Sequence, residues 1–257
     1  SNLGVALTEL GKLDEAVVSC NKATSIKPGN AEAHYNLGNA LTFLDKLDEA
    51  VTSYNKAITI KPDYAEAHSN LGNILKDLGK LDEAITSYDK ALAIKPDYSY
   101  YHSNILLTEQ YQLGQTTENL YGLHKDWDER HAQQFHATTP TYLNTPNPDR
   151  VLRIGFVSPD LGRHPVGYFV VALFENLLKT VVEIIGYSDN LADGLTKQIK
   201  ALADVWRNVS GVSDDDLAKL ILDDEIDILF DLTGHSAGSR LPLFARKPAP
   251  IQVSWAG

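Results

Sequence analysis

The sequence predicts a chain of two parts, an α-helical solenoid built from repeats followed by a parallel α/β lobe. Short patterns recur every 34 residues up to about residue 112, which is typical of a solenoid. After residue 150 the pattern changes to short β-branched runs that alternate with helical ones. A segment rich in proline, threonine and asparagine, residues 136–150, separates the two patterns and is interpreted as a linker.

Composition excludes several classes of protein. The formal charge of -11 argues against nonspecific binding of nucleic acid, which needs a basic face. No apolar run approaches a membrane span and no signal peptide is visible, and the single cysteine cannot form an intrachain disulfide. These features favour a cytoplasmic protein. The chain begins within a repeat and contains no methionine, so we expect a piece of a longer chain with some loops after residue 140 incomplete.

Three repeats are clear and a fourth is degenerate. The shared motifs are NLG, beginning at Asn2, Asn36 and Asn70, LDEA, beginning at Leu13, Leu47 and Leu81, and KP, beginning at Lys27, Lys61 and Lys95. Each unit predicts two amphipathic helices that cross closely at small residues, namely Gly4, Gly38, Gly72, Ala16, Ala50 and Ala84. Larger residues fill the next gap (Cys20, Tyr54, Tyr88), and prolines end the second helix (Pro28, Pro62, Pro96). We interpret LDEA as a helix N-terminal capping sequence rather than a catalytic one.

The fourth repeat starts at residues 101–107 and then loses the pattern, so the predicted repeat domain is 1–112, followed by a capping helix within 113–135. One equivalent position of the first helices carries Asn2, Asn36, Asn70 and Asn104. A carboxamide donates and accepts at once, so such a row would hold an extended peptide of any sequence. The alternative is that asparagine is only tolerated on a helix surface.

Residues 151–257 are predicted to form a lobe of parallel strands covered by helices on both faces. The predicted strands are 151–158, 182–189, 226–232 and 251–257, with a short segment at 206–210; the predicted helices are 166–179, 195–205, 214–222 and 240–246. In such sheets, ligands bind beyond the carboxyl ends of the strands.

Two loops at those strand ends carry unusual residues. In SPDLGRHPVGYF, Pro165 suits the first helical position, which leaves His164 just outside a helix N-terminus that favours an anion such as phosphate. Histidine exchanges protons near neutral pH, although His164 would also serve simply as a helix cap. In DLTGHSAGSR, small residues would let a ligand approach the backbone beside His235 and Ser236, or they would serve an ordinary βα turn.

GHSAG, residues 234–238, matches the G-x-S-x-G nucleophile elbow of serine hydrolases. In that fold the acid and the histidine follow the serine in chain order. No Asp, Glu or His follows Ser236 in this sequence, so the triad cannot be completed downstream. The hydrolase interpretation therefore stays open only if a continuation of the chain beyond residue 257 supplies the acid and the histidine.

The 34-residue repeats resemble the tetratricopeptide repeat, whose stacked helices form a groove for a partner segment. Joined to the blocks SPDLGRHPVGYF and RKPAPIQVSWAG, they resemble the protein O-linked N-acetylglucosamine transferases and their SPINDLY-type and bacterial relatives, the family 41 glycosyltransferases. The resemblance covers essentially the whole chain. It implies a GT-B catalytic region of two Rossmann-like lobes, of which residues 151–257 would be the first, and a fragment that is inactive without the second.

The resemblance also implies the site and its ligands. His164 matches the family's HP histidine, proposed as a general base, and Tyr168 follows it on the same helix. His235 matches the histidine of the TGH turn of SPINDLY-like and bacterial members, with Gly234 and Ser236 beside it as donor or acceptor contacts. The implied reaction is inverting transfer of a sugar from a nucleotide donor to Ser or Thr of a polypeptide in the repeat groove. No cofactor and no metal site are expected.

The donor is UDP-N-acetylglucosamine by family weight, whereas the LTGH form is nearer to members associated with GDP-fucose. The competing hypothesis is a non-enzymatic scaffold, in which the repeats present peptides and the glycosyltransferase lobe is degenerate.

Overall fold

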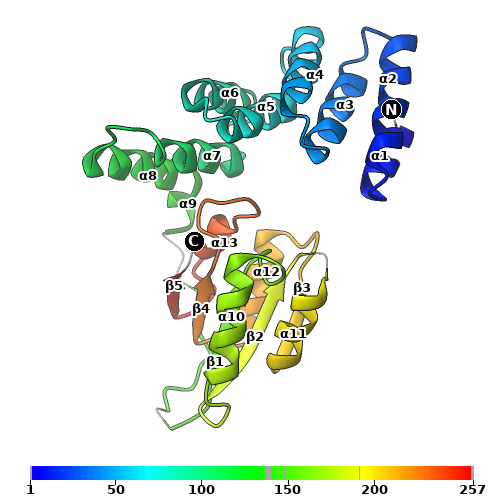
Figure 1. Ribbon diagram of the computed structural model, residues 1–257. Coiled ribbons are helices and arrows are strands. Elements are labelled where there is room, and N and C mark those ends of the chain that lie inside the picture. Colours follow the sequence, from blue (N-terminus) through cyan, green and yellow to red (C-terminus); the bar gives the residue numbers. More distant parts are fainter. Residues whose placement is uncertain (1, 137–139, 148, 191, 256–257) are drawn as a thin grey trace. The chain divides into compact units, whose positions relative to one another are not determined.

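The computed structural model describes residues 2–136, 140–147, 149–190 and 192–255, and the chain divides into two compact units, residues 1–124 and 125–257 (Figure 1). Parts of two predicted segments lie outside the described residues, namely 137–139 and 148 of the linker and 256–257 of the last strand. No helix of the described part of the chain is long and apolar enough to cross a membrane.

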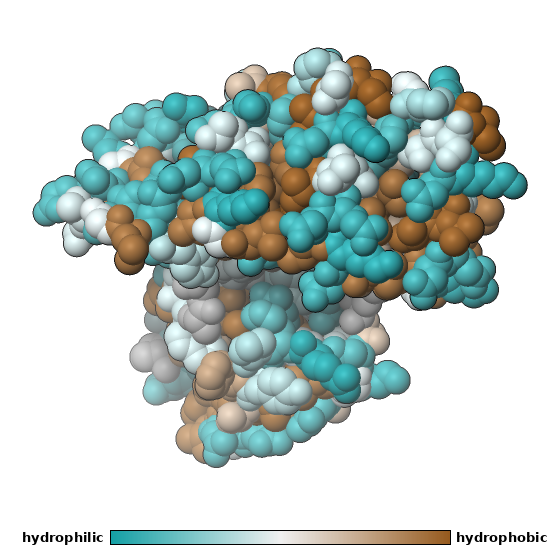
Figure 2. Space-filling model, turned by 45° about the horizontal axis from the view of Figure 1, so that its top comes forward, coloured by the Kyte–Doolittle hydropathy of each residue, from teal (hydrophilic) through white to brown (hydrophobic). Residues whose placement is uncertain are grey.

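The first unit is a series of helices in which each of the three clear repeats supplies two that pack side by side, and α7 begins the degenerate fourth (Figure 1). They are α1 (Asn2–Glu9), α2 (Leu13–Ile26), α3 (Ala31–Phe43), α4 (Leu47–Ile60), α5 (Ala65–Asp77), α6 (Leu81–Ile94) and α7 (Ser99–Glu109). The second helix of each repeat ends two residues before its proline, as predicted. Hydrophobic residues reach the surface at several places among polar ones (Figure 2).

The predicted close crossing within each repeat is confirmed. A Cβ atom added at Gly38 would lie 2.6 Å from the ring of Tyr54, and one added at Gly72 would lie 2.6 Å from the ring of Tyr88. Both tyrosines are at most 1% exposed, so each ring fills the space that the glycine leaves open. A single missing side chain on one helix therefore sets how closely its partner packs.

The interpretation of LDEA as a capping sequence needs a correction. The N-cap positions of α2, α4 and α6 are Lys12, Lys46 and Lys80, and none of them makes a side-chain capping bond. The Asp and Glu of each motif instead lie within the first helical turn. Negative charge there interacts favourably with the free N–H groups and the helix dipole, so the acids are structural, but not as caps.

The helix predicted after the repeats is divided in two, α8 (Thr117–His131) and α9 (Gln133–His136), and the division between the two units falls within α8.

The second unit contains a five-stranded sheet in which every neighbouring pair is parallel, in the order β3-β2-β1-β4-β5. The strands are β1 (Leu152–Val157), β2 (Val182–Ser188), β3 (Val205–Asn208), β4 (Ile228–Asp231) and β5 (Ile251–Ser254). The helices are α10 (Pro165–Asn176), α11 (Gly194–Leu202), α12 (Asp214–Asp223) and α13 (Leu241–Ala245). The predicted fold class, a repeat solenoid followed by a Rossmann-like parallel lobe, is confirmed.

Helices cover both faces of the sheet, as the continuous apolar strands predict. On one face, Val170 of α10 and Ile199 of α11 are fully buried with Ile184 of β2. On the other face, Leu217 of α12 and Leu243 of α13 share a second fully buried cluster. Successive residues of a strand point to opposite faces, so a strand buried on both faces must be apolar throughout.

Two helix ends were predicted too late. The helix predicted over 166–179 ends at Asn176, where Leu177 turns to extended backbone. The helix predicted to run to Val205 ends at Leu202, because Val205 begins β3 and pairs with Ile185 of β2. The short segment that the sequence left unassigned is thus the edge strand of the sheet.

Candidate active site

The two loops that the sequence singled out meet at the carboxyl edge of the sheet. They follow β1 and β4, which are neighbours, with Val157 paired to Asp231 at the end of the register. The hydroxyls of Ser158 and Thr233 lie 3.0 Å apart and join the loops by a buried hydrogen bond. Gly238 has a φ of +78°, and a Cβ there would lie 2.6 Å from Cγ of Pro159, so glycine permits the close approach.

His164 is the N-cap of α10, with extended backbone (φ -142°, ψ 153°), and Pro165 occupies the first turn as predicted. Its Nδ1 accepts a long hydrogen bond, 3.4 Å, from the amide of Val166. The carboxylate of Asp160 lies 3.9 Å from the same nitrogen. The imidazole therefore caps the helix, yet 47% of the side chain remains exposed, so a ligand can reach the ring.

Glycines shape the loop that carries His164. A Cβ at Gly167 would collide with the carbonyl oxygen of Gly162, so the first turn of α10 accepts the loop only with glycine there. A Cβ at Gly162 would lie 2.7 Å from the Thr196 hydroxyl at the start of α11. The amide of Arg163 donates to the Asp193 carboxylate, 2.6 Å away. Bonds from the Thr196 and Arg163 amides lower the pKa of Asp193.

His235 lies in a tight turn organised by Asp231, the last residue of β4. The Asp231 carboxylate accepts from the amides of Thr233 (3.0 Å) and Gly234 (3.2 Å), and Gly234 has a φ of +56°. Burial raises the pKa of Asp231 despite these two bonds. The Ser236 hydroxyl donates to the carbonyl of Thr233 at 2.8 Å. Ser236 thus stabilises the turn, which weakens the hydrolase hypothesis further.

Two aromatic side chains accompany the histidines in contrasting ways. Trp127 of α8, 6% exposed, meets His235 edge to face, with ring centroids 5.3 Å apart at 84°. This contact sets the position of the His235 ring. Tyr168, by contrast, is 59% exposed on the first turn of α10, beside the equally exposed Phe169. An exposed aromatic pair next to His164 offers a surface for a ligand ring.

Arg240 joins three loops at this edge, and no local motif in the sequence marks it. Its guanidinium donates to Asp189 after β2 (3.1 Å), to Asp214 after β3 (2.9 Å) and to the carbonyl of Val212 (2.9 Å). Burial alone would lower the pKa of Arg240, but the carboxylates of Asp214 and Asp189 outweigh it and raise the pKa. The positive charge of Arg240 is therefore paired with carboxylates of the protein itself.

The first unit carries the predicted asparagine row, and its members differ in exposure. Asn2 is exposed and Asn70 half-buried, whereas Asn36 and Asn104 are 7% and 6% exposed. Nδ2 of Asn70 donates to Oδ1 of Asn39 (3.0 Å) and to the hydroxyl of Tyr35 (3.2 Å) in the preceding repeat. At Asn70 the row thus joins one repeat to the one before it.

The next repeat breaks this bonding pattern. Ser69 occupies the position equivalent to Tyr35, and its hydroxyl is too short to reach Asn104. Oγ of Ser69 and Nδ2 of Asn104 are both buried without a hydrogen-bond partner among the described residues. A cavity of about 280 Å³ lies beside the row, lined by Asn39, Asn70, Asn73 and the exposed ring of Phe43.

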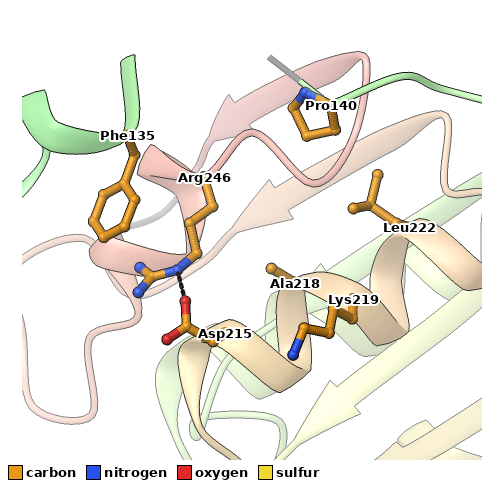
Figure 3. Close-up of a pocket in the computed structure, with 7 residues that line it drawn as sticks. All are labelled: Phe135, Pro140, Asp215, Ala218, Lys219, Leu222 and Arg246. Atoms are coloured by element: carbon orange, nitrogen blue, oxygen red, sulfur yellow. Dashed lines mark hydrogen bonds and ion pairs between the residues drawn. The ribbon is translucent and has the colours of Figure 1, made fainter. Parts of the chain in front are cut away.

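A separate cavity of about 430 Å³ lies in the second unit, between α9, α12 and α13 (Figure 3). Its arginine, Arg246, stacks over the Phe135 ring at 3.9 Å and bonds the Asp215 carboxylate at 2.6 Å. Lys219 at its rim pairs with Asp216. The charged groups that line this cavity are thus already paired within the protein. Among the described residues, no cluster of His, Cys, Asp and Glu would hold a metal ion.

Family models match both units. The model for glycosyl transferase family 41 matches residues 129–257, and tetratricopeptide repeat models match residues 4–42, 44–79 and 65–98. The chain belongs to glycosyl transferase family 41.

Individual relatives agree with this assignment. The barley (Hordeum vulgare) protein "Probable UDP-N-acetylglucosamine--peptide N-acetylglucosaminyltransferase SPINDLY" is 37% identical over 157 residues, covering 59% of this chain and 16% of the relative. The Arabidopsis thaliana SEC protein, with the same enzyme name, is 39% identical over 108 residues, covering 41% of this chain and 11% of the relative. The solved structure of a Thermobaculum terrenum O-GlcNAc transferase mutant superposes with a TM-score of 0.89 at 36% identity. The superposed region covers 99% of this chain and 49% of the Thermobaculum terrenum chain, so this chain spans about half of that protein's length.

Proposed function

We propose that this chain is the repeat region and one catalytic lobe of a protein O-glycosyltransferase. The proposed donor is UDP-N-acetylglucosamine, and the acceptor is a Ser or Thr hydroxyl of a polypeptide bound by the repeats. The observation that carries the proposal is the meeting of the His164 and His235 loops at the carboxyl edge of a parallel sheet, in a chain of family 41. The identity of the proposed donor is taken from the enzyme names of the relatives.

In the proposed reaction the acceptor oxygen attacks the anomeric carbon of the sugar. A new C–O bond forms on one face while the bond to the diphosphate breaks on the other, which inverts the anomeric centre. Nε2 of His164 takes the proton of the hydroxyl, and the nucleoside diphosphate leaves with the bonding electrons. The positive end of the α10 helix dipole would stabilise the charge that develops on the diphosphate.

The remaining site residues would bind rather than react. Gly234 and Ser236 form a turn whose backbone a sugar or phosphate can approach closely. His235, held by Trp127, would contact the donor or acceptor, and Tyr168 would contribute its exposed ring. In the repeats, Asn2, Asn36, Asn70 and Asn104 would bond the main chain of the acceptor polypeptide.

The test uses the full-length gene product with labelled UDP-N-acetylglucosamine and, in parallel, labelled GDP-fucose. We expect incorporation into protein from the first donor, and its loss in His164→Ala. The matched control is His136→Ala, which removes a surface histidine of α9 paired with Asp128. Normal transfer by a folded His164→Ala variant would remove His164 from the mechanism.

Absence of transfer from either donor by the wild-type protein would refute the enzymatic proposal and favour the scaffold hypothesis. Transfer from GDP-fucose alone would retain the reaction class and change the donor.

A further inference from the structure

Nδ1 of His164 faces two groups that make opposite demands on it. The amide of Val166, 3.4 Å away, is a donor and needs an unprotonated nitrogen. The carboxylate of Asp160, 3.9 Å away, is an acceptor and needs a protonated one. A neutral imidazole carries one proton, so it satisfies one of these groups at a time. The two choices are the two tautomers of the ring.

The tautomers differ in what they leave at the other nitrogen. When Nδ1 caps the helix, Nε2 carries the proton and has no lone pair for a base. When Nδ1 carries the proton, Nε2 has a lone pair that can accept one. The capping role and the role of general base therefore exclude each other within a single tautomer. A group that holds a proton at Nδ1 therefore selects the base at the expense of the cap.

Asp160 is held where it can do this. Its amide donates to the Ser158 hydroxyl at 2.9 Å, and its carbonyl accepts from the amide of Gly162 at 2.8 Å. Its side chain is 21% exposed, and burial raises its pKa, while nearby His164 acts in the opposite direction. An approach of about 1 Å between ring and carboxylate would make a charge-assisted hydrogen bond of ordinary length.

Other charged groups around Asp160 do not compete for this role. Asp189, whose negative charge also raises the pKa of Asp160, is bound to Arg240. Asp193 is bound to the amides of Arg163 and Thr196. Asp160 is thus the carboxylate that the structure directs at His164.

We propose that Asp160 is a positioning residue that selects the Nδ1–H tautomer of His164 and so converts a helix cap into a base. A carboxylate that fixes the tautomer of a catalytic histidine is a recurrent arrangement on unrelated folds. The catalytic half of this inference rests on the proposed function, whereas the tautomer preference does not.

The test is a long-range ¹H–¹⁵N spectrum of the present chain labelled with ¹⁵N-histidine, at a pH of about 8 where the free imidazole is neutral. The His164 signals are assigned by their loss in His164→Gln. We expect Asp160→Asn, which keeps the shape and removes the charge, to change the tautomer ratio about tenfold toward Nε2–H. Asp223→Asn, an exposed carboxylate at the end of α12, is the matched control and leaves the ratio unchanged.

An unchanged ratio in a folded Asp160→Asn variant overturns the proposal, and folding is checked by circular dichroism. In the full-length enzyme the same variant is expected to lower kcat with little change in KM for the donor. Because the spectrum needs no turnover, a protein without transferase activity would refute the proposed function and leave the tautomer result to stand or fall by itself.

Discussion

Arg240→Ala tests whether one guanidinium holds the carboxyl edge of the lobe together. The side chain is 17% exposed, and it bonds Asp214 and Asp189 at 2.9 and 3.1 Å. Truncation leaves both carboxylates without their cation, in loops that follow different strands. The loss is therefore shared among three loops instead of being confined to one.

The expected cost follows from these contacts. Breaking a fully buried ion pair costs about 3–5 kcal/mol because an uncompensated charge remains. The carboxylate side chains of Asp189 and Asp214 are each 24% exposed, so water replaces part of what they lose. We expect a loss of about 3 kcal/mol in the free energy of unfolding of the lobe. At about 3 °C per kcal/mol for a domain of this size, the melting temperature falls by about 9 °C.

The chain provides a selective assay. Its three tryptophans, Trp127, Trp206 and Trp255, all lie within the unit 125–257, so their fluorescence in urea reports on that unit. Arg163→Ala, which removes the same charge from an exposed side chain of a neighbouring loop, is expected to stay within about 0.5 kcal/mol of the wild type. A wild-type midpoint for Arg240→Ala would show that these ion pairs contribute nothing and would refute the reasoning.

Two substitutions test packing in the first unit, and a third tests a charged residue of the second. Gly38→Ala places a Cβ 2.6 Å from the ring of Tyr54 and is expected to cost about 1–3 kcal/mol, whereas Gly122→Ala, with nothing within 4 Å, should stabilise α8 by up to about 1 kcal/mol; circular dichroism in urea measures both, and equal midpoints would contradict the packing argument. In the second unit, burial acts to raise the pKa of Asp227, but bonds from Arg150 and other donors outweigh burial and lower that pKa. The stabilisation that ionised Asp227 provides is therefore present above about pH 4 and is lost in acid. The stability deficit of Asp227→Asn should therefore be full at neutral pH and shrink in acid, and a deficit that grows in acid would reverse the assigned sign.

The sequence was most informative where the chain is periodic. The 34-residue spacing located the helices, and the alternation of small and large residues located the Gly38–Tyr54 and Gly72–Tyr88 contacts. Both were predictable because an interface that recurs in every repeat requires the same residue types at the same offsets. Periodicity did not indicate how deeply each equivalent residue is buried. Four equivalent asparagines range from exposed to buried, and the repeats differ at equivalent positions such as Tyr35 and Ser69.

The site was predictable only in part for a related reason. Strand ends and helix starts can be located from local sequence, so the sequence alone identifies the loops of His164 and His235. The groups that hold them were not: Arg240 is 51 residues from Asp189, and Trp127 is more than 100 residues before His235. No regular spacing in the sequence indicates which arginine, aspartate or tryptophan will contact a residue so far along the chain. Only the folded sheet, which sets loops from separate strands side by side, reveals these pairs.

The GHSAG match shows how a local motif is produced by geometry without its chemistry. A turn from a buried strand into a following segment needs residues that tolerate positive φ, and Gly234 and Gly238 supply them at +56° and +78°. A small hydroxyl residue between them completes the turn, as Ser236 does by donating to Thr233. A nucleophile elbow instead leaves that hydroxyl free to meet a histidine. Here the bonded hydroxyl fixes the turn, and the residue before it, His235, is the one set against Trp127 at the edge of the sheet. The same backbone that would expose a serine therefore presents a histidine.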